Sequence, residues 1–200
     1  METKELKFIH ITKCAGSFIE TIGKKNNIFW GRYHKEYGWW HEEFINKDKE
    51  LKNKYDWFVI VRNPYDRILS EYYCYNGGIG KKNITHTKKE FNEYLINKIK
   101  TREQIKNIDK DHYKEQYKYI DNNVKIHIIK KENMHEELKK LFNDYNLSIN
   151  IDKYINKKIN NKESKNNKCI FDKNDFEPEL IKLINEVYEK DFILFGYDMM

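Results

Sequence analysis

The chain has 200 residues, 35% of them charged, and a formal net charge of +6. Because 38 Lys and Arg residues stand against 32 Asp and Glu residues, no uniformly basic face for nucleic acid is implied. No run of about 18 apolar residues exists, and the N-terminus has no apolar signal region. We therefore expect one soluble domain over residues 1–200, cytoplasmic or intracellular, with neither a signal peptide nor a transmembrane anchor.

The first informative stretch is residues 6–22, which read as a short apolar strand, a tight turn and the start of a helix over residues 16–25. The N–H groups at a helix start point at an anion, and the helix dipole favours negative charge there. Gly16 lets the backbone approach closely, Lys13 adds a positive charge and Ser17 adds a hydroxyl donor. The turn predicts a phosphate-binding loop, although an ordinary strand-to-helix turn with an exposed lysine has the same pattern.

A second motif occupies residues 56–73. Residues 57–61 form a continuous apolar run, typical of a strand buried on both faces, and Pro64 then opens a helix. Arg62 follows that strand directly, at the end where open α/β sheets bind ligands. Ser70 lies two turns into the helix and can approach the same end, so the pair suits a second phosphate.

The remaining elements alternate along the chain. A strand is also expected over residues 28–33 and a further one over residues 123–130. Helices are expected over residues 41–54, 88–100, 133–145 and 179–190. The Lys- and Asn-rich residues 146–168 are expected to be flexible. Strands alternating with helices predict an α/β fold with a central parallel sheet covered by helices on both faces.

Both motifs resemble those of the PAPS-dependent sulfotransferases, in the branch that contains the carbohydrate O-sulfotransferases. That family carries a strand followed by Pro-Lys-Thr-Gly-Gly-Thr-Ser and, later, Arg-(Asp/Asn)-Pro-x-x-Arg-x-x-Ser. Here residues 12–18 read Thr-Lys-Cys-Ala-Gly-Ser-Phe, and residues 62–70 read Arg-Asn-Pro-Tyr-Asp-Arg-Ile-Leu-Ser. Residues 111–120 and 191–197 resemble two further family segments, so the likeness runs over most of the chain.

The resemblance implies a P-loop-like sulfotransferase fold and transfer of a sulfuryl group from PAPS to an acceptor hydroxyl, on a carbohydrate, with PAP as the product. It implies that Arg62 and Ser70 bind the 3′-phosphate of the cofactor. The 5′-phosphosulfate side would be bound by the loop residues Lys13, Cys14, Ala15, Gly16, Ser17 and Phe18. Phe18 stands where the family often has a hydroxyl group.

Sulfuryl transfer needs a group that stabilises charge on the leaving oxygen, for which Lys13 is placed, and a base for the acceptor proton. His41 is the first candidate base, since it precedes a predicted helix and histidine titrates near neutrality. His34 is the second, and Glu42 and Glu43 lie in the same segment. Three further side chains are candidates for acceptor or cofactor contacts: His112, Gln116 and Trp40.

The cysteines Cys14, Cys74 and Cys169 are odd in number and have no metal-ligand spacing, which indicates a reducing compartment. No carboxylate pair with ligand spacing is present either, so we expect no metal.

Two other classes stay open at this point. A kinase-like P-loop transferase would need a magnesium-binding acidic residue after a strand, where this chain has Arg62. A non-catalytic module would bind a nucleotide or nucleic acid through its lysines.

Overall fold

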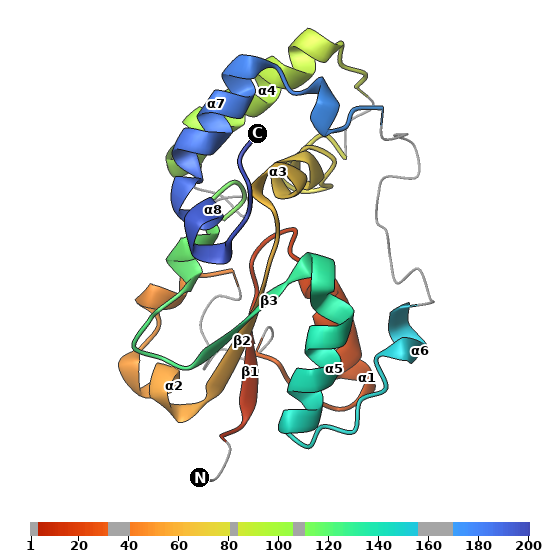
Figure 1. The fold of residues 1–200 in the computed structure, drawn as a ribbon, viewed down its shortest axis with the longest axis vertical. Helices are drawn as coiled ribbons and strands as arrows, with labels where there is room; N and C mark the ends of the chain where they lie inside the picture. Colours follow the sequence, from red (N-terminus) through yellow and green to blue (C-terminus); the bar gives the residue numbers. More distant parts are fainter. Residues whose placement is uncertain (1–3, 32–40, 81–83, 106–110, 156–169) are drawn as a thin grey trace. The chain divides into compact units, whose positions relative to one another are not determined.

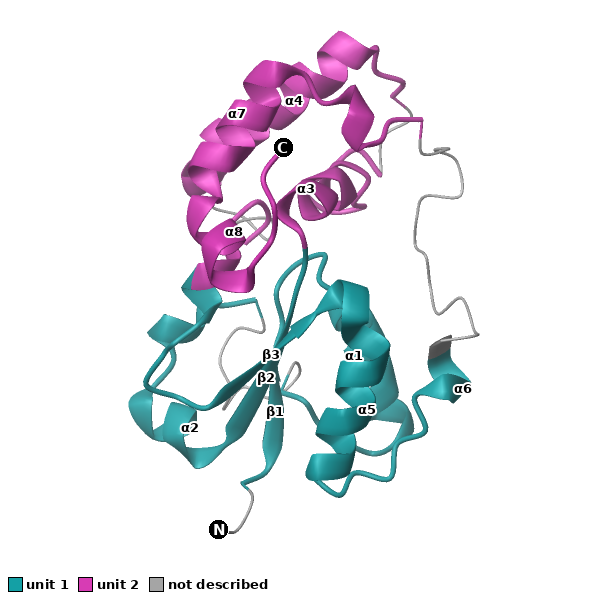
Figure 2. Cartoon of the chain, viewed as in Figure 1, with its two compact units in different colours: residues 1–62, 118–159 teal, residues 63–117, 160–200 magenta. Residues whose placement is uncertain are grey.

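The computed structural model describes residues 4–31, 41–80, 84–105, 111–155 and 170–200. The chain divides into two compact units, coloured separately in Figure 2. Unit 1 comprises residues 1–62 and 118–159, and unit 2 comprises residues 63–117 and 160–200. Unit 1 contains the sheet and the loop that follows its first strand, whereas the regular elements described in unit 2 are helices.

Within the described residues, unit 1 has three parallel strands in the order β1-β2-β3. They are β1 (Leu6–Ile9), β2 (Asp56–Val61) and β3 (Ile126–Lys130). Ile9 pairs with Val59, and Ile60 pairs with Ile129. Every residue of β2 is buried because this strand is central, which explains the apolar run that predicted it.

Helices lie on both faces of this sheet. Figure 1 shows α1 and α5 on one face and α2 on the other. The helices of unit 1 are α1 (Gly16–Lys25), α2 (Lys49–Lys54), α5 (Met134–Asp144) and α6 (Asp152–Ile155). The fold class is therefore α/β with a parallel sheet flanked by helices, as the alternating pattern predicted.

Unit 2 buries one apolar cluster between its helices, which are α3 (Pro64–Tyr72), α4 (Lys88–Lys100), α7 (Pro178–Val187) and α8 (Glu189–Phe195). The Tyr72 ring meets the Phe91 ring edge-on, with 4.7 Å between centroids. Short 3₁₀ turns complete the described chain: η2 (Phe44–Asn46), η3 (Arg102–Gln104), η4 (Gln116–Tyr119), η5 (Lys131–Asn133) and η6 (Lys173–Asp175).

The helix predicted over residues 41–54 is wrong as a single element. The segment holds the turn η2 and the separate helix α2, because Asp48 caps the second of them. The Asp48 carboxylate accepts the N–H groups of Glu50 at 2.8 Å and Leu51 at 3.1 Å, which fixes the helix start.

Residues 28–31, the described part of the strand predicted over residues 28–33, form no strand. The Phe8 N–H donates to the Trp30 carbonyl at 3.1 Å, which is one ladder-like bond to β1. The Trp30 indole is buried and donates to the Ile19 carbonyl at 3.0 Å, so this segment packs on α1 as well.

The helix predicted over residues 179–190 breaks at Tyr188, which joins α7 to α8 with the non-helical dihedrals φ −105° and ψ 19°. The buried Tyr188 hydroxyl donates to the Tyr113 carbonyl at 2.5 Å. A tertiary hydrogen bond therefore accompanies the break.

Among the described residues, no helix has the length and apolar character needed to cross a membrane. Of the predicted flexible segment, residues 156–168 lie outside the described residues, and residues 146–155 include α6.

Candidate functional site

The loop after β1 turns sharply into α1. Lys13 and Ala15 both have left-handed backbone dihedrals, with φ of 58° and 60°, which non-glycine residues seldom adopt. Helix α1 begins at Gly16 with no side-chain cap and no acidic residue in its first turn. The Phe18 N–H of this first turn donates to the Ala15 carbonyl at 2.9 Å, which leaves the N–H groups of Gly16 and Ser17 and the positive dipole end as the features that favour an anion, and Lys13 adds a cation beside them.

Gly16 packs directly on the ring of His10. A Cβ atom at position 16 would lie 1.7 Å from the His10 Nε2, so only glycine fits without a rearrangement. His10 is buried, and its Nδ1 lies 3.8 Å from an oxygen of Glu20. The start of α1 is thereby held against the end of the strand segment that leads into the loop.

His41 lies next to this loop. Its ring centroid is 4.6 Å from that of His10, and its Nδ1 is 3.2 Å from the His10 carbonyl oxygen. Because a carbonyl oxygen only accepts, Nδ1 carries the hydrogen in the neutral ring, which leaves a lone pair on Nε2. The Tyr119 hydroxyl donates to the His41 carbonyl at 3.0 Å and fixes the backbone there.

Arg62 follows β2, and the Lys13 loop follows β1. Because β1 and β2 are adjacent and parallel, both sites lie at the same edge of the sheet, the edge where open α/β sheets bind ligands. Arg62 is half-buried and belongs to unit 1. Ser70 is half-buried in α3 of unit 2.

The other predicted loop residues differ in exposure. The Cys14 thiol is fully buried, which suits a small filler in a tight turn, and Ser17 is exposed. Phe18 is half-buried in the first turn of α1. His34 and Trp40 lie outside the described residues.

His112 and Gln116 lie in unit 2, within a buried polar network. His112 Nδ1 is 2.5 Å from an oxygen of Glu71. Gln116 is fully buried, and its backbone N–H donates to the Asp191 carboxylate at 2.8 Å. Contact of either residue with the acceptor stays a prediction, while the described geometry ties Gln116 to Asp191.

Arg67, the second arginine of the motif, was not predicted as a functional residue, and the structure gives it a packing role. Only 1% of it is exposed, and its guanidinium donates to the Lys114 carbonyl at 2.5 Å. A second nitrogen lies 3.8 Å from Glu71. The spacing of four residues between Arg67 and Glu71 on a helix was the available sequence signal.

Asp191 organises the same network from α8. Burial raises the pKa of its carboxyl group, whereas the N–H groups of Gln116 and Tyr117 and the charge of Arg67 oppose that rise. Both backbone N–H groups donate to it, at 2.8 Å and 2.7 Å. Residues 111–117 and 191–197, which belong to the two later segments that resemble the family, are thus hydrogen-bonded to each other within unit 2.

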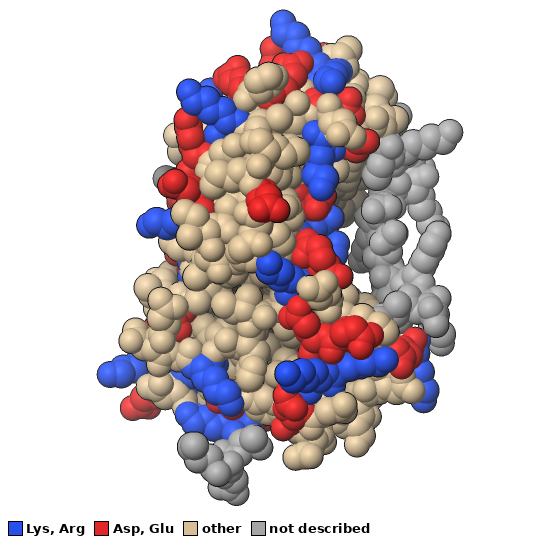
Figure 3. Space-filling model, in the orientation of Figure 1, with Lys and Arg blue, Asp and Glu red and all other residues tan. Residues whose placement is uncertain are grey.

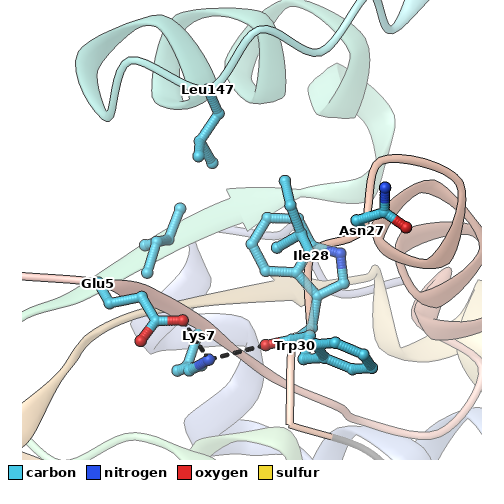
Figure 4. A pocket seen from close by; sticks show the side chains of 8 residues that line it. Glu5, Lys7, Asn27, Ile28, Trp30 and Leu147 are labelled. Carbon is cyan, nitrogen blue, oxygen red and sulfur yellow. Dashed lines mark hydrogen bonds and ion pairs between the residues drawn. The ribbon is translucent and has the colours of Figure 1, made fainter.

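Figure 4 shows a separate pocket of about 350 Å³ at the amino end of β1. Its lysine, Lys7, is bonded to Glu5 at 2.5 Å and to the Phe29 carbonyl at 2.8 Å. The pocket lies at the opposite end of β1 from the Lys13 loop, and its one lysine already has two acceptors, so it is not the candidate anion site.

The chain is thus an α/β protein with a parallel sheet, and the Lys13 loop and Arg62 follow neighbouring strands at one edge of that sheet. The family model of the sulfotransferase family matches residues 2–198, and the chain therefore belongs to that family. No curated protein and no solved structure matches the chain. The family confirms the resemblance drawn from the two motifs and assigns the chain to enzymes that transfer a sulfuryl group to an acceptor.

Proposed function

We propose that the protein transfers a sulfuryl group from PAPS to a hydroxyl group on a carbohydrate acceptor. The observation that carries the proposal is the uncapped start of α1 with Lys13 beside it and Arg62 at the same sheet edge. PAPS is the general donor of the sulfotransferase family, to which residues 2–198 are matched. The whole chain is proposed to act as one sulfotransferase domain.

The residues of this edge fit an anionic donor. The first turn of α1 has no acidic residue, and Lys13 and Arg62 are cations, so this set offers hydrogen-bond donors to phosphate or sulfate oxygens. Gly16 has no Cβ atom, and the His10 ring fills the space that one would take, so glycine allows α1 to begin directly against that ring.

Each group has a proposed role. When bound, PAPS supplies the sulfuryl group and leaves as PAP. Lys13 and the loop residues Cys14 to Phe18 form the proposed site for the 5′-phosphosulfate side. Its backbone donors are the N–H groups of Gly16 and Ser17, because those of Cys14 and Phe18 already donate to the Ile11 and Ala15 carbonyls. Lys13 also stabilises the charge that develops on the leaving oxygen. Arg62 and Ser70 bind the 3′-phosphate. No step in these roles needs a metal ion.

His41 is the proposed general base. Its Nδ1 is committed to the His10 carbonyl, so the lone pair on Nε2 is the one that accepts the acceptor proton. His34 is the alternative base. His112, Gln116 and Trp40 are proposed as acceptor-side residues from the family resemblance alone, since the described Gln116 side chain is fully buried and the His112 Nδ1 contacts Glu71.

The face of the molecule shown in Figure 3 does not have the charge pattern of a nucleic-acid site. On the face shown in Figure 3, basic and acidic side chains are interspersed over the described residues. A nucleic-acid site instead clusters its basic residues on one face.

The proposal is tested by incubating the purified protein with sulfur-labelled PAPS and a panel of glycans and small phenols. Label on a glycan, lost in the Lys13→Ala variant, supports the donor and the acceptor class. Label on phenols alone would keep the donor and remove the carbohydrate. In parallel, PAP should raise the melting temperature and ATP should not, and equal effects of the two would overturn the PAPS assignment.

A further inference from the structure

Three metal-ligating side chains converge at the end of α3 in unit 2. Glu71 offers a carboxylate oxygen, Cys74 a sulfur and His112 a ring nitrogen, and these atoms all lie within 4.8 Å of one another. We propose that Glu71, Cys74 and His112 bind one zinc-class divalent cation. This proposal does not rest on the proposed function.

The spacing of the three atoms suits a single ion. Zinc lies about 2.0–2.3 Å from nitrogen, oxygen and sulfur ligands, so the ligands of a tetrahedral site are roughly 3.2–3.8 Å apart. The His112 to Glu71 distance of 2.5 Å would open by about 1 Å when an ion replaces the hydrogen between them. Small side-chain movements therefore convert the hydrogen-bonded pair into a ligand set.

The backbone around Cys74 is already fixed. Its N–H donates to the Glu71 carbonyl at 3.0 Å, and its own carbonyl accepts the Gly80 N–H at 2.9 Å. Gly77 has φ +76°, and a Cβ there would lie 2.9 Å from the His112 Cγ, so the turn packs closely against the His112 ring. Such preorganisation lowers the ordering cost of binding an ion.

A second observation points to the same place. The Tyr113 hydroxyl is fully buried and has no hydrogen-bond partner among the described residues. Glu71 and Cys74 are among the groups close enough to interact electrostatically with this hydroxyl, so it lies near two of the three ligands. A buried orphan hydroxyl needs an explanation, and a water on the fourth position of the ion would give it a partner.

The ligand types select the ion. A carboxylate, a thiolate and a neutral imidazole carry two negative charges, so a divalent ion neutralises the ligand set, while the Arg67 guanidinium stays 3.8 Å from the other oxygen of Glu71. Thiolate and imidazole suit zinc rather than magnesium or calcium, which prefer oxygen ligands. Binding requires the Cys74 thiolate, so it releases a proton.

The ion would stabilise the folded state of unit 2 as a cross-link. It would connect the end of α3 to the segment that holds His112, which is 41 residues away from Glu71 in the chain. Because an ion that binds only the folded chain stabilises it, zinc at about 100 times its Kd should raise the melting temperature by roughly 5–10 °C.

The test uses the purified full chain, freed of metal with a chelator, and titrates in Co²⁺. The expected result is one bound ion with the visible spectrum of a tetrahedral site and a near-ultraviolet thiolate-to-cobalt band, both displaced by Zn²⁺. Cys74→Ser should abolish the thiolate band, and Glu71→Gln and His112→Gln should weaken binding by about 10-fold or more. Cys74 is half-buried and serine is nearly isosteric, so this variant remains informative even where His112→Gln fails to fold.

Two matched controls remove the same chemical groups elsewhere. Cys169→Ser takes away another thiol, and His135→Gln takes away an exposed imidazole that is bonded to Asp152. Both should bind cobalt as the wild type does. Binding without a thiolate band, a band that survives Cys74→Ser, or no binding at all would overturn the proposal.

Discussion

At the scale of single residues, Lys13 and His41 act at different moments of the proposed reaction. Lys13 stands beside the uncapped start of α1 and touches the donor before and during transfer, so Lys13→Ala should lower both PAP affinity and turnover. His41 would meet only the acceptor, so His41→Ala should leave PAP affinity nearly unchanged and slow turnover by about 10²–10⁴. Calorimetry with PAP and a labelled-transfer assay measure the two quantities.

Lys24→Ala and His135→Ala are the matched controls, since they remove the same charge from an exposed position and the same ring from a half-buried one. The wild-type rate should also rise with pH across the range where histidines ordinarily titrate, and that rise should vanish without His41. Full activity in His41→Ala together with loss in His34→Ala would make His34 the base.

The second prediction at this scale concerns the 3′-phosphate. Arg62→Ala should weaken PAP binding by roughly 2–5 kcal/mol, because it leaves a phosphate charge unpaired. Ser70→Ala removes one hydrogen bond to a charged group and should cost about 1–3 kcal/mol. Calorimetry with PAP and with adenosine 5′-phosphate separates the contacts, and an equal loss for both nucleotides would place the two residues elsewhere.

At the scale of elements, Asp191 joins α8 to the segment that begins at Gln116. The two oxygens of its carboxylate each accept one backbone N–H group, from Gln116 and Tyr117. In the Asn variant the side-chain amide has one oxygen, so its NH₂ group would face one of these N–H donors. Asp191→Asn should therefore lower the free energy of unfolding by about 1–3 kcal/mol, measured by urea denaturation. Glu189→Gln, an exposed neighbour in the same helix, should change it little, and an equal effect of both would remove the special role of Asp191.

The elements that the sequence predicts well are those whose signals are local. The bounds of α1 and α4 match the predicted ranges 16–25 and 88–100, because amphipathic spacing and end signals lie within each helix. The failures depend on tertiary contacts. Tyr188 breaks the last helix while its hydroxyl bonds to Tyr113, and no local pattern reveals that bond.

The candidate site divides in the same way. Lys13, Gly16 and Arg62 belong to contiguous motifs, and parallel pairing of β1 and β2 is enough to place them at one sheet edge. The packing of His41 on His10 joins residues 31 positions apart. The Glu71 and His112 pair is 41 positions apart, so spacing rules for metal ligands could not reveal it.

At the scale of the whole molecule, the chain has 200 residues and a net positive charge, and buried acidic side chains such as Asp56 form ion pairs and hydrogen bonds between segments that are distant in the sequence. Asp56, at the start of β2, binds Lys125 at 2.9 Å and accepts the Tyr145 hydroxyl at 2.5 Å. Burial acts to raise the pKa of Asp56, but the hydrogen bonds from Tyr145 and Lys125 outweigh it and hold the pKa below the usual 3.8. These bonds link three segments of unit 1 that are far apart in the sequence.

The last prediction concerns the acid stability that follows from this network. A carboxyl group whose pKa is lowered by folding stabilises the folded state fully above its unfolded value, and the stabilisation is lost as pH falls through the folded value. Tyr145→Phe should therefore cost about 1–3 kcal/mol of unfolding free energy at pH 7. The cost should shrink as the pH falls from 3.8, the usual value, through the lower pKa at which Asp56 of the folded chain takes up its proton. Urea denaturation at pH 7 and pH 3 measures it. Tyr154→Phe is the control, because that hydroxyl accepts from Asn26 and its contribution should not vary with pH. A cost for Tyr145→Phe that is the same at both pH values would mean that the hydroxyl does not stabilise the charged form of Asp56.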